Sequence, residues 1–168
     1  MTRLYLVRHG ETVDNVNKIM QGQTQGRLTA KGEAQAREVM EKMRTEHIDA
    51  FVSSDLKRSI DTCAIIAEPH GKPVTATPLL RERDWGGFTG RYIPDPKDEV
   101  WPDDIETIND LMARAARFLR YIRDKYPAQT VVAVGHGIIN KAIQAVYHHK
   151  AMKDILRMEN AEVRVLKL

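Results

Sequence analysis

The sequence contains a single cysteine and no long apolar run. Cys63 cannot form a disulfide within the chain, which favours a reducing compartment. No apolar stretch approaches the roughly 20 residues that a membrane-spanning helix needs. The apolar segment Leu4–Val7 is followed by Arg8 and is too short for the core of a signal peptide. We therefore expect a cytoplasmic protein without a membrane partner.

Aromatic residues are also scarce, at 6% of the 168 residues, which leaves few stacking platforms for nucleic acid. The net charge of +3 is small, and basic residues alternate with acids, as at Arg37 and Glu38 or at Arg123 and Asp124. This pattern is typical of solvated helix faces. We expect no nucleic-acid partner, since a small positive excess equally suits an anionic small molecule.

The length fits one α/β domain, and we expect residues 1–168 to fold as a single domain without disulfides or metal. Apolar runs predict buried strands at Leu4–Val7, Ala50–Val52 and Val131–Val134, with a weaker one at Val74–Thr77. Val163–Leu166 alternates apolar and polar residues, as an edge strand does.

Amphipathic segments between these runs predict helices over Thr29–Arg44, Ser54–Glu68, Glu106–Tyr126 and Ile138–His148. Alternating strands and helices predict an α/β fold, a three-layer sandwich in which helices cover both faces of a mostly parallel central sheet. The segment Arg91–Asp104 carries three prolines and five acids, which predicts an irregular surface loop.

Polar residues follow three of the predicted strands. Arg8 and His9 follow the first, Ser53–Asp55 ends the second and leads to Arg58, and His136 follows Val131–Val134 between two glycines. The carboxyl ends of parallel strands lie on one edge of a sheet, where ligands bind. We therefore expect these two arginines and two histidines to converge.

Such a cluster suits phosphate. Guanidinium groups match phosphate oxygens with planar forks, and the helix starts after Ser54 and Gly137 offer backbone donors. A neutral imidazole inside the pocket is a competent nucleophile near neutral pH. A proton donor for the leaving oxygen is also required. Glu82, before a glycine-rich turn, is the first candidate, and composition leaves Asp84 and Glu11 as rivals.

The chain resembles the histidine phosphatase superfamily, which includes cofactor-dependent phosphoglycerate mutases. Six blocks match in order along nearly the whole chain, namely Arg8–Thr12 with Asn15, Gln21–Gly22, Leu28–Ala36, Ser53–Arg58 with Thr62, Glu82–Arg83 before Gly86, Gly87 and Gly90, and Gly135–Gly137. Each block alone is weak, whereas six in sequence with compatible spacing are specific.

The resemblance implies a role for each matching residue. His9 is the nucleophile that becomes phosphohistidine, and Glu82 is the general acid and then the base that activates water. Arg8, Arg58 and His136 hold the phosphoryl oxygens without a metal or other cofactor. The matching blocks also make substrate-binding candidates of Asn15, Gln21, Gly22, Arg83 and Gly137.

Departures from the mutases favour a phosphatase acting on a small phosphorylated metabolite. The residue after Gly137 is Ile138, where mutases tend to have asparagine, and Arg91–Asp104 is shorter and more acidic than the mutase insertion. The Glu82–Arg83 block leaves bisphosphorylated sugars and glycerates possible. A mutase-type phosphotransferase and an inactive phospho-ligand binding protein remain the alternatives, although an inactive relative would be expected to lose His9, Arg58 or Glu82.

Other conspicuous residues have simpler interpretations. Cys63 lies in a helical apolar pattern and is expected in the core. The spacing of the histidines, without thiolate or carboxylate partners, argues against zinc, and His47, His70, His148 and His149 are expected at the surface or at helix ends. Trp85 and Trp101 either frame a substrate pocket or pack elsewhere.

Overall fold

A computed structural model describes residues 1–93 and 99–168. Its centre is a five-stranded sheet in the order β3-β2-β4-β1-β5. The strands are β1 (Arg3–Arg8), β2 (Ala50–Ser54), β3 (Val74–Thr77), β4 (Thr130–Gly135) and β5 (Val163–Lys167). β5 is antiparallel to β1 at one edge, and the other pairs are parallel. The predicted strands and the edge position of the last one are confirmed.

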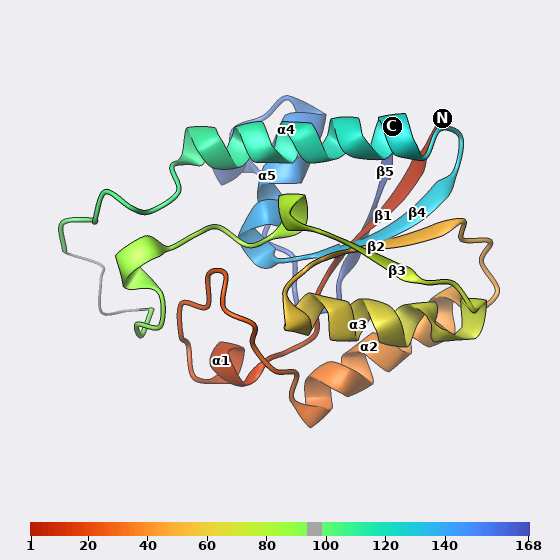
Figure 1. The fold of residues 1–168 in the computed structure, drawn as a ribbon, viewed down its shortest axis with the longest axis horizontal. Helices are drawn as coiled ribbons and strands as arrows, with labels where there is room; N and C mark the ends of the chain where they lie inside the picture. The colour runs from red at the N-terminus through yellow and green to blue at the C-terminus, as the bar shows by residue number, and fades with distance from the viewer. Residues whose placement is uncertain (94–98) are drawn as a thin grey trace.

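Helices cover both faces of the sheet, as the sequence predicted (Figure 1). The longer ones are α2 (Ala30–Met43), α3 (Lys57–Ala67), α4 (Ile108–Lys125) and α5 (Gly137–His148), and α1 (Val13–Val16) is a single turn. The short 3-10 turns are η1 (Glu68–His70), η2 (Pro78–Leu80), η3 (Gly86–Phe88) and η5 (Met152–Asp154). α2 and α3 pack on one face, and α4 and α5 on the other, so the three-layer α/β fold is confirmed.

Strand periodicity divides the core into two layers. Leu4 and Leu6 of β1 pack in the cluster under α4 and α5, whereas Val7 packs in the cluster under α2 and α3. Successive side chains of a strand point to opposite faces, so a strand with apolar residues at every position is buried on both sides. Cys63 is fully buried in the second cluster, as predicted, and burial raises the pKa of its thiol to about 12.

Local hydrogen bonds set the helix starts. Thr29 and Thr107 cap α2 and α4, with each side chain accepting an amide hydrogen bond three residues along. α3 begins at Lys57 and not at the predicted Ser54, because Ser54 ends β2 and its hydroxyl accepts a hydrogen bond from the Leu56 amide, making a turn. This delay places Arg58 in the first turn of α3.

Strand register brings the candidate residues to one edge. Arg8 lies opposite Gly135 where β1 pairs with β4, so His9 and His136 leave neighbouring strands at the same level. The His9 amide donates to the Gly135 carbonyl at 3.1 Å. The segments that carry α1 and η3 lie beyond these strand ends (Figure 1).

The predicted irregular loop is confirmed for its described part, residues 91–93 and 99–104, which contains no helix or regular strand. Pro94 and Pro96 lie outside the described residues. An isolated bridge joins Ile19 to Tyr92, and the Ile93 amide donates to the Lys18 carbonyl at 2.8 Å. This part of the loop is therefore tied to the segment after α1.

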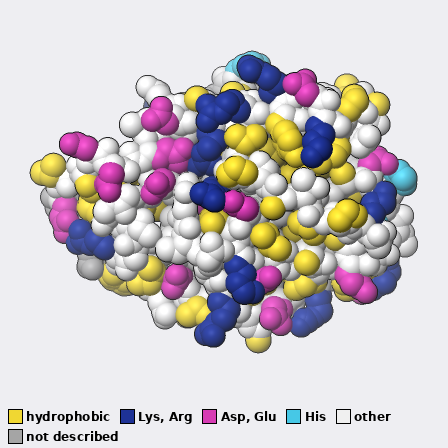
Figure 2. All heavy atoms as spheres, in the orientation of Figure 1, with side chains coloured by type: hydrophobic (Ala, Val, Ile, Leu, Met, Phe, Trp, Pro, Cys, Tyr) yellow, Lys and Arg dark blue, Asp and Glu magenta, His cyan; other side chains and the backbone are white. Residues whose placement is uncertain are grey.

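Charge is dispersed on the face shown in Figure 2, where Lys and Arg side chains lie among Asp and Glu side chains. That distribution agrees with the mixed charges of the sequence, and the absence of a nucleic-acid partner stays a prediction. In the described ranges, no helix has both the length and the apolar composition that crossing a bilayer requires.

Two glycines allow the loop that follows β1, residues 9–12, to touch α2. We call it the His9 loop. A Cβ on Gly32 would lie 2.0 Å from the Glu11 carbonyl oxygen, and one on Gly10 would lie 2.4 Å from the Gly32 carbonyl oxygen. The loop that follows His9 therefore rests on the first turn of α2 through direct backbone contact.

We predict that Gly32→Ala destabilises the protein. The same change at an unconstrained helical position stabilises by ~0.4–1 kcal/mol, but here the new methyl must displace Glu11, and overpacking typically costs about 1–3 kcal/mol. Urea denaturation measures the difference. Glu38→Ala on the exposed side of α2 is the control, with an expected change within about 0.5 kcal/mol. An increase in stability for Gly32→Ala would contradict the contact.

Candidate active site

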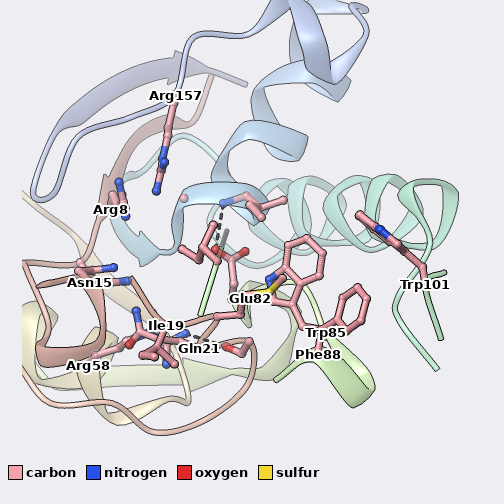
Figure 3. A pocket seen from close by; sticks show the side chains of 16 residues that line it. Arg8, Asn15, Ile19, Gln21, Arg58, Glu82, Trp85, Phe88, Trp101 and Arg157 are labelled. Carbon is pink, nitrogen blue, oxygen red and sulfur yellow. Dashed lines mark hydrogen bonds between the residues drawn. The ribbon is translucent and has the colours of Figure 1, made fainter. Parts of the chain in front are cut away.

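A cavity of about 640 Å³ opens at the carboxyl ends of β1 and β4 (Figure 3). Its lining combines charged and polar residues with a group of large apolar ones. They are Arg8, His9, Asn15, Ile19, Met20, Gln21, Gly22, Arg58, Glu82, Trp85, Phe88, Ile93, Trp101, Gly137, Ile138 and Arg157. Most of the predicted site residues are in this set, so the expected convergence of elements occurs.

The His9 ring is held in one tautomer. Its Nδ1 lies 2.7 Å from the Gly10 carbonyl oxygen, which can only accept, so Nδ1 carries the hydrogen and Nε2 keeps its lone pair. Burial, followed by the charges of Arg58 and Arg8, holds the pKa of His9 well below its ordinary value. The result is a neutral imidazole at the cavity wall.

Arg58 is almost completely buried and donates in three directions. Its Nε donates to His136 Nδ1 at 3.2 Å, Nη2 to the Gly22 carbonyl at 2.7 Å, and Nη1 to the Thr24 carbonyl. Burial lowers the pKa of Arg58 to about 10. These bonds hold the guanidinium rigidly at the cavity and leave further N–H groups for a ligand.

His136 lies behind Arg58 and does not line the cavity. Because its Nδ1 accepts from Arg58, the neutral ring carries its proton on Nε2, which lies 2.9 Å from Ser54 Oγ and 3.1 Å from Ser59 Oγ. Burial, followed by the charge of Arg58, lowers the pKa of His136 well below its ordinary value. The structure thus shows His136 supporting Arg58, and its ring lies 5.1 Å from the His9 ring, centroid to centroid. The expected contact of His136 with a phosphoryl oxygen stays a prediction.

Arg8 keeps one donor unused. Its Nη1 donates to the Met158 carbonyl at 2.7 Å, whereas the buried Nε finds no hydrogen-bond partner in the described part of the chain. Burial, and secondarily Arg157, lowers the pKa of Arg8. A buried guanidinium N–H without a partner is costly, so this donor points to an anionic ligand.

The segment before β5 encloses the His9 loop from the other side. The Ala161 amide donates to the carbonyls of Arg8 and His9, at 2.9 Å and 3.2 Å. Asn160 Nδ2 donates to the His9 carbonyl and to Asn15 Oδ1, both at 3.2 Å. Sequence reasoning did not find these contacts, because Asn160 belongs to no recognisable motif.

Glu82 caps helix α5. Its Oε2 accepts from the Ile138 amide at 3.0 Å, and its Oε1 from the amides of Ile139 and Arg83, both at 2.9 Å. The side chain lies inside the cavity between the arginines and the aromatic residues (Figure 3). The carboxyl group therefore lines the same cavity as His9, as the acid role requires.

The helix starts do not offer the donors that the sequence suggested. At α5, the Ile138 and Ile139 amides already bind Glu82. At α3, the Lys57 amide donates to the Gln25 side chain and the Arg58 amide to the Gln25 carbonyl. The guanidinium groups are thus the main free donors facing the cavity.

Arg114 fixes the backbone that carries Glu82. This buried cation donates to the carbonyls of Leu79, Arg81 and Glu82 and forms an ion pair with Glu106 at 2.8 Å. Glu106 in turn accepts from the Asp84 amide at 3.0 Å. An extended segment without a helix or strand partner thereby gains a defined position.

The predicted substrate-binding residues divide into two groups. Asn15, Gln21, Gly22 and Gly137 line the cavity. Arg83 does not, because its guanidinium donates to the Glu106 carbonyl at 2.8 Å and stacks 4.6 Å from the Trp85 ring.

Neither rival of Glu82 lines the cavity. Asp84 accepts from the Gly86 amide at 2.9 Å, which closes the turn before η3. Glu11 accepts from the Thr29 hydroxyl at 2.9 Å on the side facing α2. Glu82 is the acid that the geometry favours.

Arg157 and several apolar residues were missed. Arg157 is exposed and points toward Arg8 at the cavity mouth (Figure 3). It follows no predicted strand, so nothing in the sequence distinguished it from other surface cations. Trp85 and Trp101, whose role was left open, both line the cavity.

No three His, Cys, Asp or Glu side chains within residues 1–93 and 99–168 gather in an arrangement that could hold a metal ion. Metal independence of the reaction stays a prediction.

The profile of the histidine phosphatase superfamily (branch 1) matches residues 4–168, so the chain belongs to this superfamily. The resemblance found in the sequence is thereby confirmed.

Named relatives include phosphatases and mutases. The chain is 37% identical over 141 residues to an uncharacterized phosphatase PhoE of Bacillus subtilis (strain 168), covering 82% of this chain and 72% of that protein. It is 46% identical over 99 residues to a probable phosphoglycerate mutase GpmB of Enterobacter sp. (strain 638), covering 59% of this chain. That match spans about half the relative's length, at 46%.

Solved structures share the whole fold. Bacillus stearothermophilus YhfR superposes with a TM-score of 0.92 at 27% identity, covering 100% of this chain and 92% of that one. A mycobacterial glucosyl-3-phosphoglycerate phosphatase in complex with VO3 gives a TM-score of 0.90 at 27% identity, covering 98% and 92%.

The buried histidines predict a pH-dependent stability. Because folding lowers the pKa of His9 and of His136, the unfolded chain binds more protons below its ordinary histidine pKa of about 6.5. The free energy of unfolding should therefore be highest above that pH. It should fall on acidification by up to about 1.4 kcal/mol per pH unit for each histidine.

Urea denaturation between about pH 5.5 and 7.5 measures this slope. His9→Ala should remove about one histidine's share of it. An unchanged slope in His9→Ala would show that His9 is not buried in its neutral form.

Proposed function

We propose that this chain is a metal-independent phosphatase that hydrolyses small phosphomonoesters through a phosphohistidine at His9. One observation carries the proposal: the 2.7 Å contact of His9 Nδ1 with the Gly10 carbonyl leaves Nε2 unprotonated in a cavity lined by Arg8 and Arg58. A neutral ring nitrogen beside two guanidiniums is suited to attack a phosphoryl group that those guanidiniums hold.

In the first half of the reaction, His9 Nε2 attacks phosphorus and the bond from phosphorus to the ester oxygen breaks. The departing alkoxide takes a proton from the protonated Glu82 carboxyl group. Arg8 Nε and the free N–H groups of Arg58 hold the phosphoryl oxygens throughout. His136 acts by orienting Arg58.

In the second half, the Glu82 carboxylate removes a proton from water, and the resulting hydroxide attacks phosphorus. The nitrogen–phosphorus bond breaks, inorganic phosphate leaves, and His9 regains its lone pair. Glu82 ends protonated, ready for the next ester. The reaction consumes one water molecule and needs no metal or other cofactor.

The phosphatase and mutase names among the relatives support phosphoryl-transfer chemistry in general. The similarity to the probable phosphoglycerate mutase GpmB favours the alternative of a phosphoglycerate mutase, which needs a bisphosphorylated primer and a second anion site. Arg157 is the cation at the cavity mouth that such a site would use. Against this, the wall opposite the arginines is apolar, which favours release of phosphate to water over its transfer to a second anionic molecule.

We predict that His9→Ala abolishes phosphate release. The loss should be about a thousandfold or more, because no other imidazole lines the cavity in the described residues. Release of inorganic phosphate from nitrophenyl phosphate measures it, and His47→Ala, an exposed histidine, is the matched control. Full activity in His9→Ala would exclude the covalent mechanism.

Phosphate release by the unchanged protein should also be unaffected by EDTA.

The same assay separates the mutase alternative. Given 3-phosphoglycerate and a bisphosphoglycerate primer, the unchanged protein should release phosphate faster than it isomerises the substrate. Primer-dependent interconversion that outpaces hydrolysis would replace the phosphatase proposal by the mutase.

Glu82→Gln tests the acid. An alkoxide is a poor leaving group, whereas nitrophenolate leaves without help, so phosphoenzyme formation should slow by about 10²–10⁴-fold for alkyl phosphates and far less for nitrophenyl phosphate. Hydrolysis of the phosphoenzyme should slow for both. Rapid mixing should therefore show a burst of nitrophenol followed by slow turnover. Equal slowing of formation from both esters would reduce Glu82 to a positioning residue.

A further inference from the structure

The end of the cavity away from the arginines is apolar. Five large side chains form it, and we call them the apolar wall: Trp85, Phe88, Ile93, Trp101 and Ile138. Figure 3 shows Arg8, Asn15, Arg58 and Arg157 on one side of Glu82, and Trp85, Phe88 and Trp101 on the other. The cavity thus has a polar end and an apolar end, with the candidate acid between them.

The aromatic part of the wall has a defined geometry. The Trp101 ring lies edge-on to Trp85 and to Phe88, with centroids 5.7 Å and 5.8 Å apart. Behind the rings, the Arg83 guanidinium lies 4.6 Å from Trp85 and 5.5 Å from Trp101. Cation–π contacts of this kind hold aromatic rings in place.

The backbone beneath the wall is also fixed. Phe88 packs with Met20 and Ile105 in a small core of its own. The Gly87 amide donates to Asp104 at 3.0 Å, which joins the turn carrying Trp85 and Phe88 to the segment carrying Trp101. The wall is therefore built into the fold, although Trp101 stays 49% exposed and Ile93 52% exposed. Large apolar side chains left exposed around a cavity are characteristic of binding sites.

The position of Glu82 indicates which part of a substrate meets this wall. On the proposed function, on which this inference rests, the phosphoryl group lies at Arg8 and Arg58 and the ester oxygen at Glu82. The alcohol part must then extend beyond Glu82, toward the apolar wall. A cavity of about 640 Å³ leaves room for a group much larger than phosphate.

We propose that the preferred substrate is a phosphomonoester whose alcohol or phenol part is apolar and long enough to reach Trp85 and Trp101. Small polar esters such as phosphoserine or phosphoglycerate would leave the apolar wall in contact with water. The discriminating contact is burial of the leaving group against the aromatic rings.

A series of n-alkyl phosphates tests the inference. Ethyl, butyl and hexyl phosphate have leaving groups of similar basicity, so differences in kcat/KM report contact with the wall. Each methylene that becomes buried should raise kcat/KM by up to about fourfold, and hexyl phosphate should exceed ethyl phosphate by at least about tenfold. A flat or falling series would overturn the inference. So would a preference for 3-phosphoglycerate over hexyl phosphate, which would assign Arg157 to a second anionic group.

Trp101→Ala should flatten the chain-length dependence. Val100→Ala is the matched control, because Val100 is the neighbouring apolar residue, is 95% exposed and does not line the cavity. The control should keep the slope of the unchanged protein. Equal slopes in both variants would show that Trp101 does not contact the alkyl chain.

Binding to His9→Ala separates this inference from the proposed function. The chain has only two tryptophans, and both line the cavity, so tryptophan fluorescence reports on this site alone. Hexyl phosphate should bind at least about tenfold more tightly than ethyl phosphate. If the binding series holds but no ester is hydrolysed by the unchanged protein, the proposed function fails and this inference stands. If esters are hydrolysed but neither binding nor turnover depends on chain length, the inference alone fails.

Discussion

The site depends on burying two guanidinium groups without a carboxylate against either. Arg58 is 1% exposed and Arg8 is 6% exposed, and within the described residues neither forms an ion pair. Backbone carbonyls of Gly22, Thr24 and Met158 supply partial negative charge instead. The positive charge of the two guanidiniums is therefore only partly balanced, and an entering phosphate dianion would supply the missing negative charge.

This shortage of negative charge explains the protonation state of the neighbouring imidazole rings of His9 and His136. A protonated histidine beside two buried cations would add to the repulsion, so both imidazoles are kept neutral. Neutrality suits His9 to its proposed role as nucleophile and lets His136 accept the Arg58 N–H. Among the described residues, Glu82 is the only carboxylate that lines the cavity, and it is held by backbone amides and not by either arginine. Both guanidiniums are therefore available.

Much of the fold and of the candidate site could be predicted from the sequence, because apolar runs and parallel topology depend on local patterns. The strands, the confirmed three-layer fold and the meeting of His9 with Arg58 follow from residues at strand ends. The direction of Arg83 could not be predicted, because it is set by Glu106 and Trp85, which lie on other segments. Nor could the place of His136 behind Arg58, since strand-end position does not determine which partner a ring nitrogen selects.

The contacts of the segment before β5 with Arg8 and the His9 loop have a consequence for synthesis of the chain. Arg8 and the Met158 carbonyl that it binds are 150 positions apart in the sequence. On the ribosome, His9 emerges early, while the residues that enclose its loop have not yet been made. The site is therefore assembled only after nearly all of the described fold has been synthesised, so an unfinished chain lacks the carbonyl that holds Arg8 at the cavity.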